Sequence, residues 1–280
     1  MKLPAVLLAS AVFAVSAAAA VVTAAAPAAP AVQLAGRAEQ GGIMRGTLPP
    51  GATAPTLDGR PVKTGPDGRF LIGFGRDAAA TAVLAWQAAD GAPAQRLLTI
   101  TPRQWRVQSL PTLPPRPVPD AEFDARRPAE LAQIAAARAV IGDGTAWQGR
   151  FVIPARGPIT GVYGAQRILA GTPSAPHAGL DIGAATGAPV VAPAAGTVRL
   201  AAGPFTLEGN LVMIDHGFGL VSALLHLSRI DVRPGEVVAR GQRIGTAGAT
   251  GRATGPHLHW GVTWTDVRID PAALLQEPPR

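Results

Sequence analysis

The residues of this chain that can bind a metal or transfer a proton are concentrated in its second half. The sequence has five histidines, all beyond residue 176, and no cysteine. A thiolate metal site is therefore excluded, and any bound metal must be held by histidine, aspartate or glutamate. The segregation of the histidines indicates a single functional site. They are His177, His216, His226, His257 and His259.

Two short motifs among these residues have a spacing that suits a shared site. His177 and Asp181 are four residues apart, and the neighbouring proline and glycines argue against a helix. On an extended segment, an even separation places both side chains on one face. His257 and His259 are two residues apart, so on a strand they also project to the same side.

This set of side chains fits metal-assisted hydrolysis of an amide bond. A catalytic zinc site has three protein ligands and one open position. His177, Asp181 and one histidine of the later pair would supply three ligands. The remaining histidines would activate water or stabilise the developing oxyanion. His226 lies in an apolar run, where a lone histidine is more often a core residue, and we expect a structural role for His216 before its glycine turn.

The elements that position these residues are predicted to be mainly short β-strands. The 280 residues include 33 glycines and 28 prolines, a composition that favours strands and turns over long helices. We expect a signal peptide at residues 1–29, a small β-sandwich-like domain at 34–113, a proline-rich linker with one helix at 114–146, and a catalytic domain at 147–275.

The N-terminal residues predict export. Lys2 precedes an apolar run that reaches about residue 15, and the alanine-rich stretch that follows offers several cleavage sites of the A-x-A kind. An uncleaved membrane anchor is the alternative, although alanine and proline make a poor membrane span. We therefore expect an exported, periplasmic protein whose signal peptide is cleaved.

The segment before the catalytic domain contains no histidine and is interpreted as a spacer or docking module. Turn sequences at residues 57–60 (LDGR) and 65–68 (GPDG) separate its short apolar runs, which is typical of hairpins. The linker helix is expected over residues 128–140, beginning at Pro128. A short helix is also expected over residues 271–275.

The C-terminal half resembles the lysostaphin/LytM-type zinc endopeptidases that cleave peptidoglycan peptides. The resemblance covers about residues 152–271 and rests on an ordered series of motifs. These are HAGLDI (177–182), GAPVVAP (187–193), GTV (196–198), GNLVMIDHG (209–217), HLS (226–228), GEVVARGQRIG (235–245), GATG (248–251) and TGPHLH (254–259).

The resemblance implies a catalytic domain built as an antiparallel β-sheet groove. It implies Zn²⁺ as cofactor, with His177, Asp181 and His259 as ligands and with His226 and His257 as catalytic histidines. Two positions depart from the usual family pattern. Leu224 replaces a frequent tyrosine and Gly261 replaces a frequent acidic residue, so we expect a change in groove shape or rate rather than loss of zinc.

The predicted function is hydrolysis of peptidoglycan stem peptides or cross-links by metal-activated water. The alternatives are a non-catalytic LytM-like regulator or cell-wall-binding module, and a zinc peptidase that acts on ordinary proteins. A biotinyl or lipoyl carrier is excluded because no lysine follows Lys63. The net charge of +7 is scattered, so no nucleic-acid partner is expected. We expect a monomer, with peptidoglycan peptides and a regulatory envelope protein as candidate partners.

Overall fold

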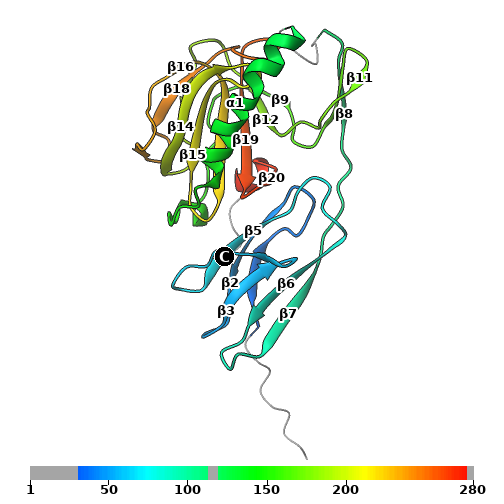
Figure 1. The fold of residues 1–280 in the computed structure, drawn as a ribbon, viewed down its shortest axis with the longest axis vertical. Coiled ribbons are helices and arrows are strands. Elements are labelled where there is room, and N and C mark those ends of the chain that lie inside the picture. Colours follow the sequence, from blue (N-terminus) through cyan, green and yellow to red (C-terminus); the bar gives the residue numbers. More distant parts are fainter. Residues whose placement is uncertain (1–30, 113–118, 276–280) are drawn as a thin grey trace, which may run out of the picture. The chain divides into compact units, whose positions relative to one another are not determined.

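The computed structural model describes residues 31–112 and 119–275, and strands dominate both ranges (Figure 1). The predicted signal peptide and the proline-rich residues 113–118 lie outside the described residues. Within the described ranges, no helix is long and apolar enough to cross a membrane. The prediction of a mainly β protein with one helix in the linker is confirmed.

The N-terminal residues form two antiparallel sheets, as expected for a small β-sandwich-like module. The turn predicted at residues 57–60 is a tight hairpin, in which Asp58 and Gly59 both have positive φ. One sheet has the order β1-β2-β5 and the other β4-β3-β6-β7. Their strands are β1 (Gln33–Gly36), β2 (Ile43–Thr47), β3 (Thr53–Leu57), β4 (Arg60–Pro61), β5 (Arg69–Gly73), β6 (Thr81–Gln87) and β7 (Pro93–Thr99).

A small three-stranded sheet joins the end of this segment to the C-terminal half. Strand β8 (Val107–Leu110) runs parallel to β10 (Gln166–Leu169), and β10 pairs with β11 (Thr172–Pro173). Thus the last strand before residue 113 pairs with a strand of the histidine-bearing half. This pairing crosses one of the predicted domain boundaries. The boundaries themselves remain a prediction.

The C-terminal half is built on a 10-stranded sheet in which every pairing is antiparallel. Its main path has the order β17-β14-β15-β16-β19-β12-β9, and β13, β18 and β20 pair with these strands. The strands are β9 (Ile159–Gly161), β12 (Gly179–Gly183), β13 (Pro189–Val191), β14 (Gly196–Phe205), β15 (Gly209–Asp215), β16 (Leu220–Ile230), β17 (Val237–Val238), β18 (Arg243–Ala247), β19 (His257–Trp264) and β20 (Val267–Ile269).

The central strand β19 separates the core from the functional face of this sheet. Leu258, Trp260 and Val262 are fully buried in the main hydrophobic core. Because side chains alternate along a strand, His257 and His259 project from the opposite face. The expected short helix near the C-terminus is present as α2 (Ala272–Leu275), and a 3₁₀ turn occupies Ala146–Gln148.

Helix α1 (Asp120–Ala139) is longer than the sequence predicted. It begins eight positions before Pro128, which lies inside the helix rather than at its first turn. Pro119 stands at the N-cap, and Asp120 and Glu122 place negative charge in the first turn, where the helix dipole favours it. The expected start at Pro128 is therefore wrong: α1 continues through this exposed proline although its ring lacks the N–H of a helical hydrogen bond.

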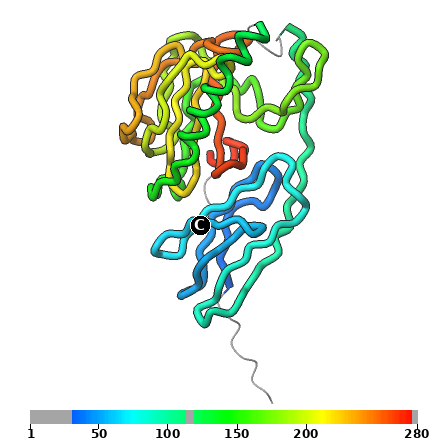
Figure 2. The backbone as a smooth tube through the Cα atoms, viewed as in Figure 1, coloured from blue at the N-terminus to red at the C-terminus, as the bar shows by residue number. Residues whose placement is uncertain are grey.

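The helix lies across strands β14 and β15 (Figures 1 and 2). Ile134 and Ala137 pack on a small apolar cluster formed by Leu200, Phe205, Leu211, Met213 and Val221. Val221 pairs with Thr263 and Leu225 pairs with His259, so this apolar cluster and His259 share one face of the sheet. Helix α1 therefore covers part of the face that carries the histidines.

The buried carboxylate of Glu130 binds α1 to the turn that follows β14. Its Oε1 accepts hydrogen bonds from the backbone N–H and the hydroxyl of Thr206, both at 2.7 Å. We expect Glu130→Ala to lower the free energy of unfolding by about 2 kcal/mol, because a buried amide loses its acceptor. Urea unfolding measures the change. Glu122→Ala is the control, since its pair with Arg126 is exposed and should contribute under about 0.5 kcal/mol. Equal effects of the two substitutions would contradict this role for Glu130.

Candidate metal centre

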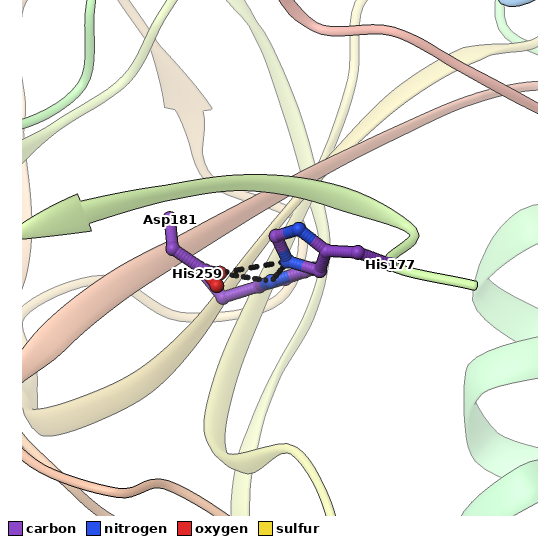
Figure 3. Close-up of side chains that lie close together, drawn as sticks. All are labelled: His177, Asp181 and His259. Carbon is purple, nitrogen blue, oxygen red and sulfur yellow. Dashed lines mark hydrogen bonds and ion pairs between the residues drawn. The ribbon is translucent and has the colours of Figure 1, made fainter. Parts of the chain in front are cut away.

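Three of the predicted site residues converge on one point. Asp181 of β12 and His259 of β19 are direct partners across two antiparallel strands, so their side chains lie together on one face. His177 precedes β12 and reaches the same place. Asp181 Oδ1 lies 2.7 Å from His259 Nδ1 and 2.9 Å from His177 Nε2, and the two ring nitrogens are 3.0 Å apart (Figure 3).

Hydrogen bonds outside this cluster orient the ligand atoms. His177 Nδ1 lies 2.9 Å from the carbonyl oxygen of Val162. A carbonyl only accepts, so Nδ1 carries the proton and Nε2 presents its lone pair to the cluster. Arg167 donates to Asp181 Oδ2 at 3.2 Å, which leaves Oδ1 for the cluster. Each of these two ligands is thus held by a neighbour through the atom that faces away from the centre.

The protonation states suit a divalent cation. Burial alone would raise the pKa of Asp181, but its close contacts with the His177 and His259 rings outweigh burial and hold the pKa well below the usual range. Burial lowers the pKa of His259 and keeps its ring neutral. The centre therefore offers one carboxylate and two imidazoles, all three buried, with ligand atoms within 4.8 Å of one another. This is a donor set that zinc accepts.

His226 and His257 flank the three ligand residues. Their ring centroids are 4.8 Å apart, and His226 is 6.1 Å from the His259 ring. His257 Nδ1 faces the carbonyl of Gly255 and His226 Nδ1 faces the carbonyl of Thr250, both at 2.8 Å. By the same argument both Nδ1 atoms carry protons, and both Nε2 atoms are free to accept one. His257 Nε2 lies 3.9 Å from Asp181 Oδ1.

A distortion of strand β16 brings His226 to this place. Leu224 and Leu227 both belong to the hydrophobic core, although they are three residues apart, which regular alternation forbids. Between them His226 has φ 64°, and the pairing with β15 and β18 shifts register. This is a β-bulge, a feature that redirects side chains near functional sites. Without it, His226 would point into the core with Leu224.

His216 lies outside the centre and has a structural environment, as the sequence suggested. Its ring is fully buried, with Nδ1 2.8 Å from the Ala195 carbonyl and Nε2 2.8 Å from the Ser222 hydroxyl. Phe151 packs edge-on at 4.9 Å between centroids. Burial lowers the pKa of His216 to about 4, so the folded protein holds this ring neutral.

The low pKa of His216 predicts a loss of stability in mild acid. The unfolded chain takes up a proton near the ordinary pKa of 6.5, whereas the folded chain does so only near 4. Stability should therefore fall as the pH drops from about 6.5 towards 4, by up to about 1.4 kcal/mol per pH unit. Denaturant unfolding between pH 7 and 4.5 measures this slope. His216→Asn should be less stable at pH 7 but lack this component, and identical slopes in the two proteins would contradict the assignment.

Two hollows meet at the centre. One, of about 230 Å³, is lined by Asp181, His257 and the residues just before it, and the other, of about 260 Å³, reaches under helix α1. Both are lined by Arg167, His226, Arg252 and His259. Arg167 and Arg252 were not expected in the site, because both fall outside the sequence motifs that bear histidine. Both hollows therefore border the cluster at His259.

Comparison with known proteins agrees with this geometry. The profile of peptidase family M23 matches residues 175–271. A solved structure from Pseudomonas aeruginosa that is assigned to peptidase M23 has 30% sequence identity and a TM-score of 0.66, covering 85% of this chain and 95% of its own. The chain therefore belongs to peptidase family M23, and the predicted resemblance is confirmed.

Curated relatives match over the same region. Peptidoglycan DD-endopeptidase ShyA of Vibrio cholerae is 47% identical over 87 residues, which are 31% of this chain and 20% of that protein. Cell division protein DipM of Caulobacter vibrioides is 34% identical over 134 residues, 46% of this chain and 21% of that protein. The chain spans about a fifth of the length of these relatives.

Proposed function

We propose that this protein is a zinc endopeptidase that hydrolyses peptide bonds of peptidoglycan. The observation that carries the proposal is the convergence of His177, Asp181 and His259, with two proton-accepting histidines beside them in a groove. The family supports a peptidase, and the name of the Vibrio cholerae relative supports peptidoglycan as the substrate.

In this proposal His177, Asp181 and His259 hold the zinc. When bound, zinc supplies a Lewis acid that polarises the scissile carbonyl and makes water a stronger nucleophile at neutral pH. Asp181 brings one negative charge to the site, and Arg167 keeps its carboxylate in a fixed orientation. The His177 ring is fixed by its bond to the Val162 carbonyl.

His257 and His226 act on the proton of the attacking water. His257 donates from Nδ1 to the Gly255 carbonyl, so its neutral ring presents the lone pair of Nε2, which can accept the proton and later pass it to the leaving amine. Burial, together with His259 and His257, lowers the pKa of His226 to about 3. His226 therefore stays neutral and orients water through Nε2 as a hydrogen-bond acceptor. In this proposal water is the nucleophile, so the reaction uses no serine or cysteine side chain for attack.

Digestion of purified peptidoglycan tests the proposal. The protein is incubated with isolated sacculi with added zinc or with a chelator, and soluble products are identified by mass spectrometry. New muropeptides that require both zinc and His257 would support the proposal, and their masses would identify the bond. A protein that binds zinc yet releases no peptide would contradict it, and one that neither binds zinc nor cleaves would favour the wall-binding alternative.

The proposal includes export to the periplasm, action as a monomer, and control by an envelope partner. Export is supported by the sequence of residues 1–29 and by the cell-wall names of the relatives. Zinc remains the proposed metal because one carboxylate and two imidazoles form the donor set of the cluster.

A further inference from the structure

The hollow beneath helix α1 is lined by an unusual number of arginines. Its volume is about 260 Å³, and Glu208 is the one acidic residue among its lining residues. We call this hollow the arginine pocket. The arginines that line it are Arg127, Arg138, Arg167, Arg252 and Arg268.

The nearby carboxylates are already engaged with two of these arginines. Glu208 accepts two hydrogen bonds from Arg127, at 2.6 and 2.8 Å. Asp181 accepts one from Arg167 and also belongs to the metal cluster. The five arginines of the pocket therefore outnumber these two carboxylates, and the charge of Arg268 acts on Arg138.

Buried polar atoms in the pocket wall lack partners. Among the described residues, the Nε atoms of Arg138 and Arg167 and the hydroxyl of Thr263 are buried without a hydrogen-bond partner. Burial lowers the pKa of Arg138, and the nearby charge of Arg268 lowers it further. A buried donor without an acceptor is costly, and a cluster of them indicates a group that the pocket is built to receive.

These donors suit an anion with oxygen acceptors. Guanidinium donors form a planar fork that matches a carboxylate through two parallel hydrogen bonds. The arginine pocket also includes His226 and His259, so its ligand lies directly against the reacting centre. In a peptide substrate, the acyl-side residue has used its α-carboxyl in the scissile amide. In a cross-link, where the scissile nitrogen is a side-chain amine, the residue that supplies the nitrogen can keep its own α-carboxyl free, and this is then the nearest free α-carboxylate.

We propose that the arginine pocket binds a free carboxylate on the residue that supplies the scissile nitrogen, with Arg138 as a principal ligand. This inference rests on the proposed peptidase function and names its substrate class. The enzyme would select amide bonds next to a free carboxylate and would discriminate against the same bonds when that carboxylate is amidated.

Two synthetic cross-linked muropeptide dimers test this selection. They differ in one group on the residue that supplies the scissile nitrogen, which is a carboxylate in one dimer and a carboxamide in the other. We expect kcat/KM to be about 10- to 100-fold higher for the carboxylate dimer, the usual value of a charge-assisted hydrogen bond. Arg138→Gln should remove this preference by lowering only the rate on the carboxylate dimer. Arg138→Lys should restore part of it.

Arg126→Gln is the matched control, because Arg126 lies on the same helix but does not line the pocket, and its contacts are Glu122, the Pro204 carbonyl and, at 3.8 Å, Glu130. It should leave both rates within about twofold of the wild type. The carboxamide dimer reports on folding, since a misfolded Arg138 variant would lose activity on both substrates. Equal rates of the wild-type protein on the two dimers, or an equal fall on both in a folded Arg138→Gln protein, would overturn the proposal.

A binding measurement separates this proposal from the peptidase proposal. Zinc-loaded His257→Ala protein is titrated calorimetrically with each dimer, with and without Arg138→Gln. Tighter binding of the carboxylate dimer that depends on Arg138 supports the pocket even if neither dimer is cleaved. Equal binding of the two dimers overturns it, even if both are hydrolysed.

Discussion

Asp181→Ala is expected to abolish high-affinity zinc binding and to lower peptide-bond hydrolysis by about a thousandfold or more. The carboxylate is the only negative charge in the cluster, and its Oδ1 lies within 2.9 Å of the ligand nitrogens of both histidines. Loss of the metal removes several kcal/mol of stabilisation from the transition state, which converts to this factor in rate. Metal content by elemental analysis and the rate of muropeptide release measure the two effects.

The control for this substitution is Asp231→Ala. Asp231 pairs with Arg229 and Arg243, both of which are exposed, away from the lining of either hollow. Its loss should leave zinc content and rate unchanged. If Asp181→Ala retained both zinc and activity, the cluster of His177, Asp181 and His259 could not be the metal centre.

His257→Ala is expected to separate catalysis from metal binding. The ring lies beside the cluster, its Nε2 is 3.9 Å from Asp181 Oδ1, and its proton is committed to the Gly255 carbonyl. Its removal should leave about one zinc per chain and lower kcat by about 10²- to 10⁴-fold, the usual contribution of a general base. Zinc content and steady-state kinetics on the same preparation measure both quantities.

The outcome for zinc decides the role of His257. A variant that loses zinc together with activity would make His257 a ligand. A variant that keeps full activity would leave His226 as the sole base.

Much of the metal centre follows from short-range sequence spacing. His257 and His259 share a face because β19 is a strand, and Asp181 lies on β12 with His177 just before that strand, close enough in sequence to reach the same place. The register between these strands, which sets Asp181 opposite His259, depends on the whole sheet and could not be derived from spacing. The family resemblance supplied that pairing in advance.

Two features could not be read from the sequence, for different physical reasons. His226 looks like a core residue in its apolar run, and only the bulge with φ 64° turns it towards the groove. Arg138 looks like an ordinary surface residue near the end of a helix, where cations favour the helix dipole. Its burial against the groove depends on where α1 packs, and tertiary contacts decide that.

The most direct test of the account is a zinc titration of the metal-depleted wild-type protein. Zinc is added in known amounts, and bound metal and muropeptide release are measured on the same samples. We expect the rate to rise in proportion to bound zinc and to reach its plateau at about one zinc per chain, while Asp181→Ala gives neither tight binding nor release. Release from fully metal-depleted protein at the same rate, or a bound zinc that leaves the rate at zero, would contradict a zinc peptidase centred on His177, Asp181 and His259.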